Sequence, residues 1–204
     1  MENSLKSELK DMLKDLSKYI DGDWFVGDGA LLGLVREKDL IELDNDIDIF
    51  LLPNAKLKLP KDCPYGIQRY YMDIKFYLKK NKPKKRNAWL EYLSYKRQSP
   101  TSKGLNRPQL TSRCAKTYKE EKIIPQFTDP YIDIFYLKWD GDKYIIGDNW
   151  ANIYYTEEEV LLLDTNSDLG FDVPIPNNAH DILKRQYGDD YMIADPNFTY
   201  FGSK

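Results

Sequence analysis

The chain has 204 residues, of which 42 % are hydrophobic and 14 % aromatic, so it should fold as a globular protein rather than stay disordered. No apolar stretch approaches the roughly 20 residues of a bilayer-spanning helix, and the start lacks the basic-then-apolar pattern of a signal peptide. These two features predict a cytoplasmic protein without a membrane span. Two distant cysteines, Cys63 and Cys114, and a single histidine, His180, argue against a disulfide framework and a structural zinc site.

The net charge of −3 hides a strong asymmetry along the chain. Residues 79–122 carry 14 basic and 3 acidic side chains, or +11, whereas the rest of the chain carries −14. Proline and glycine interrupt this block, so we expect mixed helix and loop there, as a basic insertion in a single domain that spans residues 1–204. The basic block could bind nucleic acid, but a run of like charges is more often a solvated loop. Nucleic acid is therefore not the favoured partner.

The first third of the chain predicts a helix, a strand and a second helix. Residues 4–20 place leucine and methionine at helical spacing between charged residues, which is typical of an amphipathic helix. Residues 24–26 read as a short buried strand, and Gly27-Asp28-Gly29-Ala30 should then turn tightly into a helix over residues 31–36.

The remaining elements are mostly strands. Residues 44–52 alternate Asp with Asn or Ile before an apolar run, which predicts a strand with a polar start, and residues 66–78 predict one or two more. Residues 131–137 form a strong strand pattern that should make a hairpin with residues 144–146. Pro176-Asn177-Asn178 predicts the start of a closing helix, which Gly188 should end.

Three aspartates fall at alternate positions of the second strand. Side chains of a strand alternate between its faces, so Asp44, Asp46 and Asp48 should project to one side while Ile47 and Ile49 enter the core. Carboxylates at such spacing repel each other, and a divalent cation neutralises them best. Hard oxygen ligands in this number favour Mg²⁺ or Mn²⁺, which commonly take their remaining ligands from substrate phosphates.

Asp133 is a lone acid in an otherwise apolar strand, where an unpaired charge costs several kcal/mol. If its strand lies beside the strand of Asp46 and Asp48, the three acids would complete a metal-binding set. The alternative is that Asp133 occupies a solvent-facing position of a half-exposed strand.

The glycine turn offers a place for a phosphate. Gly27, Gly29 and the backbone N–H groups around Ala30 lie where a helix begins, and small residues there let an anion approach the main chain. Taken alone this is weak, since many strand-to-helix connections contain glycine for steric reasons.

Two other motifs are less consistent with the sequence. An EF-hand calcium loop would need Gly and Glu where this chain has Ile49 and Ala55. A dinucleotide-binding fold would place the acid at the end of the second strand, whereas the acids here precede the apolar run.

The sequence resembles the LicD/fukutin family of nucleotidyltransferase-fold phosphotransferases, in three segments that follow the family's order. The segments are residues 29–36 with 44–49, then residues 131–135, then residues 173–176 leading to Leu183 and residues 187–192. The chain departs from the family pattern in having Ala30 where Thr is usual and Asn45 where Asp is frequent. The resemblance implies an α+β fold, with a nucleotidyltransferase-like mixed β-sheet flanked by helices.

The resemblance also implies an activity and roles for residues. Members of the family transfer phosphocholine, ribitol phosphate or a sugar phosphate from a nucleotide-diphosphate donor to a glycan hydroxyl. For this chain a CDP-linked donor is favoured. By that likeness Asp46 and Asp48 bind the metal, Asp44 and Asp133 assist, and Arg36 lies near the phosphates. On this hypothesis Asp133 helps to activate the acceptor hydroxyl while amides near Gly29 absorb negative charge.

Two alternatives remain open at this point. The same carboxylates could move a nucleoside monophosphate onto a small molecule, RNA or protein, which would release pyrophosphate instead of a nucleoside monophosphate. A non-enzymatic alternative is a nucleic-acid-binding module that uses the basic block on a decayed transferase fold.

Overall fold

The computed structural model describes residues 5–42, 44–70, 73–81, 84–87, 123–126, 129–147 and 153–194. Within these ranges, residues 69–70, 84–87 and 123–126 are described by their backbone alone. The chain divides into two compact units. One is Met1–Lys82 with Asp129–Met192, and the other is Pro83–Thr128 with Ile193–Lys204. The predicted basic insertion overlaps the second unit, and most of it lies outside the described residues.

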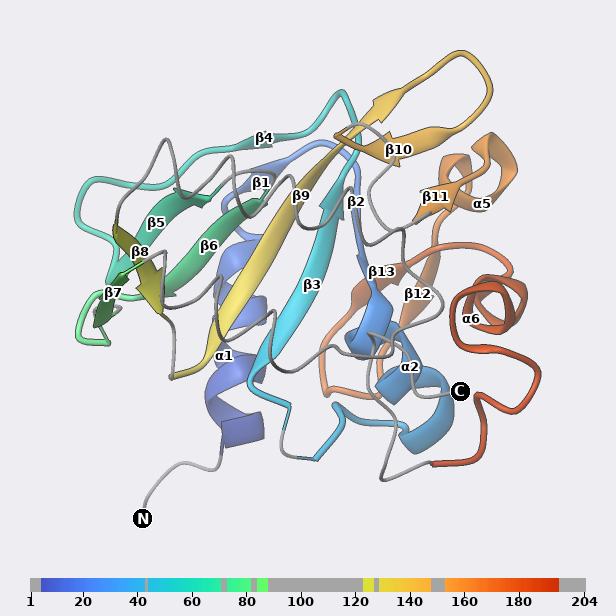
Figure 1. Ribbon diagram of the computed structural model, residues 1–204, viewed down its shortest axis with the longest axis horizontal. Helices are drawn as coiled ribbons and strands as arrows, with labels where there is room; N and C mark the ends of the chain where they lie inside the picture. The colour runs from blue at the N-terminus through green and yellow to red at the C-terminus, as the bar shows by residue number, and fades with distance from the viewer. Residues whose placement is uncertain are drawn as a thin grey trace. The chain divides into compact units, whose positions relative to one another are not determined.

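The described elements form a mixed α+β fold (Figure 1). In chain order they are α1 (Leu5–Ser17), β1 (Ile20–Asp21), β2 (Trp24–Gly27), α2 (Asp28–Glu37), β3 (Asp46–Leu51), β4 (Lys56–Leu57), β5 (Tyr65–Tyr70), β6 (Asp73–Leu78), β7 (Lys84–Asn87), β8 (Ile123–Gln126), β9 (Tyr131–Trp139), β10 (Tyr144–Ile146), β11 (Tyr154–Tyr155), α5 (Glu157–Leu161), β12 (Asp164–Asn166), β13 (Val173–Ile175) and α6 (Ala179–Tyr187). None of these helices combines the length and apolar character that crossing a bilayer requires.

A seven-stranded mixed sheet organises the first unit, as far as the structure describes it. Strands β3 and β9 run parallel at its centre, where Figure 1 draws them side by side, and β2 pairs antiparallel with the other edge of β3. Two strands pair with the edge of β9 that faces away from β3. Strand β6 pairs antiparallel with the first part of β9, and β10 pairs antiparallel with its last part. Strand β5 then pairs with β6, and β11 pairs with β10.

One face of the sheet is apolar and packs on α1. The helix contributes Leu9, Met12, Leu13 and Leu16, all almost completely buried, which matches the amphipathic helix predicted for residues 4–20. The sheet contributes isoleucines from both central strands, and Ile47, Ile49, Ile132 and Ile134 are each 0 % exposed. Burial of so much apolar surface supplies the main driving force for this layer.

The opposite face of the sheet is half aromatic and half charged. Its aromatic end stacks Phe25 on Phe50 and Phe50 on Phe135, with ring centroids 5.4 and 5.3 Å apart. Tyr155 closes the cluster from β11. Gly27 is required beside it, because a Cβ there would lie 2.3 Å from the Phe50 ring.

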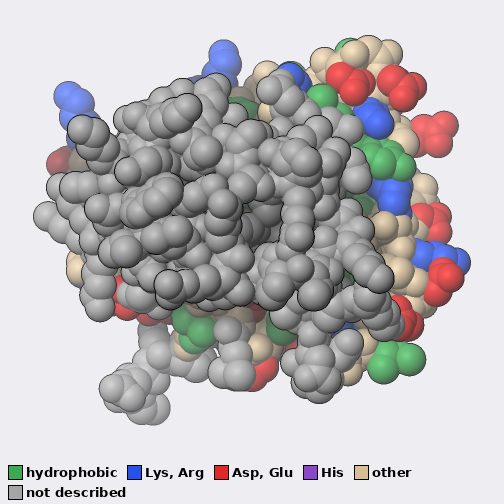
Figure 2. All heavy atoms as spheres, viewed as in Figure 1, with side chains coloured by type: hydrophobic (Ala, Val, Ile, Leu, Met, Phe, Trp, Pro, Cys, Tyr) green, Lys and Arg blue, Asp and Glu red, His purple; other side chains and the backbone are tan. Residues whose placement is uncertain are grey.

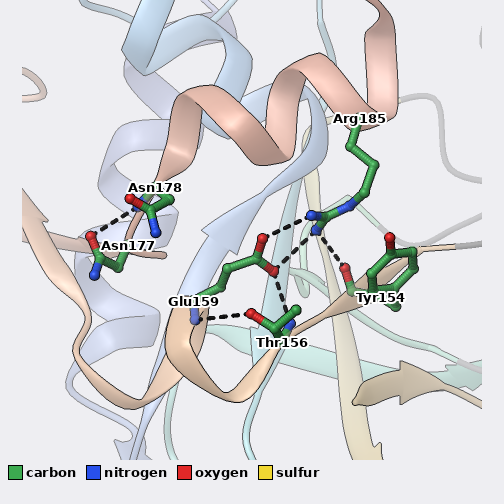
Figure 3. Close-up of polar contacts among 6 residues, drawn as sticks. All are labelled: Tyr154, Thr156, Glu159, Asn177, Asn178 and Arg185. Atoms are coloured by element: carbon green, nitrogen blue, oxygen red, sulfur yellow. Dashed lines mark hydrogen bonds and ion pairs between the residues drawn. The ribbon is translucent and has the colours of Figure 1, made fainter. Parts of the chain in front are cut away.

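Helix α5 and helix α6 are joined by a network of polar contacts (Figure 3). Thr156 and Glu159 form a capping box at the start of α5, which satisfies backbone donors of the first turn. Arg185 from α6 binds both carboxylate oxygens of Glu159 at 2.8 and 3.1 Å and donates to the carbonyl of Tyr154. Since the Glu159 side chain is only 8 % exposed, this pairing is what makes its buried charge tolerable.

Most elements predicted from the sequence are confirmed, with two corrections. The second helix begins at Asp28, three residues before the predicted start, so the glycine turn forms its first turn instead of preceding it. Within the basic block, residues 84–87 form strand β7, which pairs with β8, so the expectation of helix and loop is wrong there. Pairing with a segment so distant in sequence leaves no local pattern.

We expect Arg185→Met to lower the free energy of unfolding by about 2 kcal/mol, because it leaves the buried carboxylate of Glu159 without its cationic partner. Urea denaturation measures the change. The matched control on the same helix is Lys184→Met, whose ion pair with Asp189 is exposed on both sides. That variant should unfold like the wild type, and equal losses in the two variants would contradict the role given to Arg185.

Candidate functional site

A row of polar positions crosses four neighbouring strands on the partly charged face of the sheet. The register places Lys75 of β6 opposite Asp133 of β9, Asp133 opposite Asp48 of β3, and Asp48 opposite Gly27 of β2. Residues opposite each other in adjacent strands project to the same face and lie roughly 5 Å apart. The two acids predicted from separate strands are therefore direct neighbours.

The burial of these strands confirms the expected alternation. Asp46 and Asp48 alternate with Ile47 and Ile49, which are fully buried on the α1 face. Asp133 is 7 % exposed, so the alternative that it faces solvent is wrong. Asp44 precedes the strand, and its backbone N–H donates to the carbonyl of Ile41 in the preceding loop.

Lys75 supplies a cation to one end of the row. Its Nζ donates to both carboxylate oxygens of Asp133 at 2.5 and 2.8 Å and lies 3.1 Å from Oδ2 of Asp73. The same ammonium lies over the Tyr131 ring, 4.4 Å from its centroid. Although burial favours the neutral amine, Asp133 and Asp73 hold the pKa of Lys75 above its ordinary value. We therefore treat the Lys75–Asp133 pair as ionised.

Asp46 is held by a tyrosine of the neighbouring strand. The Tyr131 hydroxyl donates to Oδ2 of Asp46 at 2.9 Å, and the two residues are partners in the register of β9 and β3. Burial, together with the nearby charges of Asp46 and Asp133, raises the pKa of Tyr131 above its ordinary value. This hydroxyl therefore stays protonated and serves as a hydrogen-bond donor.

Burial and repulsion from neighbouring carboxylates raise the pKa values of Asp48 and Asp133. Burial raises the pKa of Asp133 to about 7, and Lys75 opposes that shift. The pKa of Asp48 lies well above its usual range because the carboxyl is buried and close to the charges of Asp28, Asp46 and Asp133. Carboxyl groups in this state gain from any cation that reaches them.

Two more carboxyl groups lie at the start of α2. Asp28 is 8 % exposed, and burial raises its pKa to about 7, with a further contribution from Asp46. Burial and a hydrogen bond with Asp46 likewise raise the pKa of Asp44 to about 7. A Cβ at Gly29 would lie 3.0 Å from Oδ2 of Asp44, so the absence of a side chain at Gly29 makes room for that carboxyl group.

The residues predicted to bind phosphate are only partly brought together. Gly27 and Gly29 lie beside the acids, whereas the Ala30 side chain points into the apolar core, so only its backbone faces the turn. Arg36 lies in the last turn of α2, on the order of 12 Å along the helix from Asp28. Its guanidinium contacts Glu37 at 2.7 Å and the Tyr191 carbonyl at 3.5 Å. Its role near a phosphate stays a prediction.

The donor set suits a hard divalent cation, since it consists of buried carboxylates that repel one another. One of its oxygens, Oδ1 of Asp28, makes no hydrogen bond. In the part of the chain that the structure describes, however, no three acidic, histidine or cysteine side chains are gathered as a ready-made ion site. Holding an ion would therefore require carboxylate side chains to rotate about their χ angles.

Sequence reasoning missed three polar residues at this site. Lys75 sits in a strand whose alternation resembles an ordinary solvent-facing edge, and Asp28 reads as a turn residue. Gln186 of α6 lies close enough to Asp28 for its amide to lower the pKa of that carboxyl group.

The other candidate ligands contribute little to the site. Cys63 is free and buried, and Cys114 lies outside the described residues. His180, an exposed residue of α6, contacts the hydroxyl of Tyr191.

On the face drawn in Figure 2, acidic and basic side chains of the described residues are intermingled along the right-hand margin. That margin therefore forms no patch of one sign.

Comparison with models of protein families gives no match for this chain, and comparison with curated proteins gives none either.

The pKa of Asp28 predicts how stability depends on pH. The folded state keeps the Asp28 proton up to about pH 7, whereas the unfolded chain loses it near pH 4. The stabilisation is therefore present below about pH 4 and is lost as the pH rises through about 7. Asp28→Asn removes this loss, so between pH 4 and pH 8 its stability relative to wild type should rise, on the order of 4 kcal/mol.

Urea denaturation in the presence of a chelator at several pH values measures this difference. The charged groups that face Asp28 are Asp46 and Asp48 of β3. Asp142→Asn, in the exposed β9–β10 turn, is the control and should run parallel to wild type. A parallel curve for Asp28→Asn as well would show that Asp28 titrates normally.

Proposed function

We propose that this chain is a divalent-cation-dependent transferase with a nucleotidyltransferase-like fold, which moves a phosphate-linked group from a nucleotide-diphosphate donor to a hydroxyl acceptor. The observation that carries the proposal is the direct register of Asp48 with Asp133 on two parallel strands, with Asp46 beside them on the same face. Buried acids from two strands are what phosphoryl-transfer chemistry needs to position a metal and an attacking hydroxyl.

The donor set fits Mg²⁺ or Mn²⁺ in its chemistry, with Asp46 and Asp48 as ligands. A bound ion would offset the negative charge of the phosphates as it develops during transfer. Around it, the chain's own residues do three things. Tyr131 orients Asp46 through its hydroxyl, backbone amides at the start of α2 face the donor, and Lys75 fixes the orientation of Asp133.

In this mechanism, Asp133 receives the proton of an acceptor hydroxyl. Lys75 holds both of its oxygens, which limits the carboxyl to one rotamer and lowers the entropy cost of using it. The transferred group, the donor base and a glycan acceptor follow from the family resemblance alone, with CDP-linked donors favoured.

The second candidate, nucleotidyl transfer, uses the same carboxylates and differs in the product. A phosphotransferase releases a nucleoside monophosphate, whereas a nucleotidyltransferase releases pyrophosphate. Screening CDP-, UDP- and GDP-linked donors and nucleoside triphosphates for magnesium-dependent thermal stabilisation identifies the donor first, because a ligand that binds the folded state raises its melting temperature.

We expect Asp46→Asn and Asp48→Asn each to lower the rate of transfer from that donor by at least about 100-fold, with the far-UV circular dichroism unchanged. The reason is that each variant removes a carboxylate from the set that holds the ion. Asp142→Asn, an exposed acid of the same sheet, should keep the wild-type rate. A fully active Asp48→Asn protein would count decisively against this mechanism.

A further inference from the structure

Asp28 is a buried acid in a strained backbone position. It begins α2 with φ of +44°, a left-handed conformation that residues other than glycine adopt rarely, although Asp and Asn tolerate it best. The residue is 8 % exposed, and Oδ1 is buried without a hydrogen-bond partner. Strain combined with an unsatisfied buried polar atom is costly, and proteins retain such combinations mainly at functional sites.

The chain places the Asp28 backbone next to the carboxylate row. It follows Gly27, which is the register partner of Asp48, so Asp28 flanks Asp48 on the side opposite Asp133. The electrostatics agree with this placement. After burial, Asp28 is the strongest of the charges that act on Asp48, and Asp46 acts on Asp28 in turn.

The two flanks of Asp48 differ in their counter-charge. On the β9 side, Asp133 has Lys75 on both of its oxygens. On the α2 side, the ion pairs formed among the described residues join no cation to Asp28, Asp46 or Asp48. A divalent ion placed on the α2 side would relieve three like charges, whereas one on the β9 side would have to compete with an ammonium that is already bound.

We propose that Asp28, Asp46 and Asp48 form the divalent-cation site of this chain, and that Asp133 remains paired with Lys75 and does not bind the ion. This inference rests on the proposed function only in taking a divalent ion as part of the site. It changes the third ligand from the residue expected by sequence to one in the first turn of α2.

The test is a titration of the full chain with Mn²⁺ alone, in which electron paramagnetic resonance measures the free ion. Asp28→Asn should weaken Mn²⁺ binding at least tenfold while keeping the left-handed backbone, since Asn tolerates that conformation. Asp28→Gly, which accepts the same φ, is a second variant with the same expected loss.

The double variant Lys75→Met with Asp133→Asn tests whether Asp133 binds the ion. It removes one positive and one negative charge together, so no ammonium is left to repel the ion. This protein should bind Mn²⁺ within threefold of wild type. The exposed Asp142→Asn is the neutral control, and thermal unfolding of each variant confirms that it is folded.

The outcomes separate this inference from the function on which it builds. Wild-type affinity in both Asp28 variants would overturn the assignment of Asp28, and a tenfold loss in the double variant would overturn the exclusion of Asp133; either result would leave a cation on Asp46 and Asp48. Unchanged binding in Asp46→Asn and Asp48→Asn, or no binding by the wild type, would overturn the proposed function as well.

Discussion

The parallel pairing of β3 with β9 holds the centre of the site together. It sets Asp48 beside Asp133, and the pairing of β9 with β6 brings Lys75 into the same row. A slip of one residue would turn Asp48 to the α1 face and expose Ile47 or Ile49 in its place. The apolar layer under α1 therefore holds the register that keeps the acids together on the opposite face.

The site is costly for stability, and its two ends offset that cost differently. At the β9 end, Lys75 and the Tyr131 hydroxyl satisfy Asp133 and Asp46. At the α2 end, Asp28 keeps an unpartnered oxygen in a strained backbone. Stability comes instead from parts of the unit away from the acids, namely the α1 layer, the aromatic stack around Phe50 and the buried Glu159–Arg185 pair.

The sequence allowed the fold elements and two of the strands that carry acids to be predicted, because local alternation reports which residues share a face. The acids of residues 44–48 and the isolated Asp133 stood out for that reason. Lys75 and Asp28 did not stand out, because each looks ordinary within its own segment. Only the pairing of distant strands brings Lys75 beside Asp133 and Asp28 near Asp48. Strand β7 escaped prediction in the same way, since its partner β8 begins at residue 123.

The acidity of the turn at α2 has a consequence for any phosphate that binds there. Backbone amides at a helix start favour an anion, but Asp28 and Asp44 already place carboxyl groups against this one. A donor phosphate would be repelled by them until a divalent ion offsets their charge. Under the proposed function, the ion and the donor must therefore bind with positive coupling. Because binding linkage is reciprocal, the donor would raise the affinity for the ion by the factor by which the ion raises the affinity for the donor.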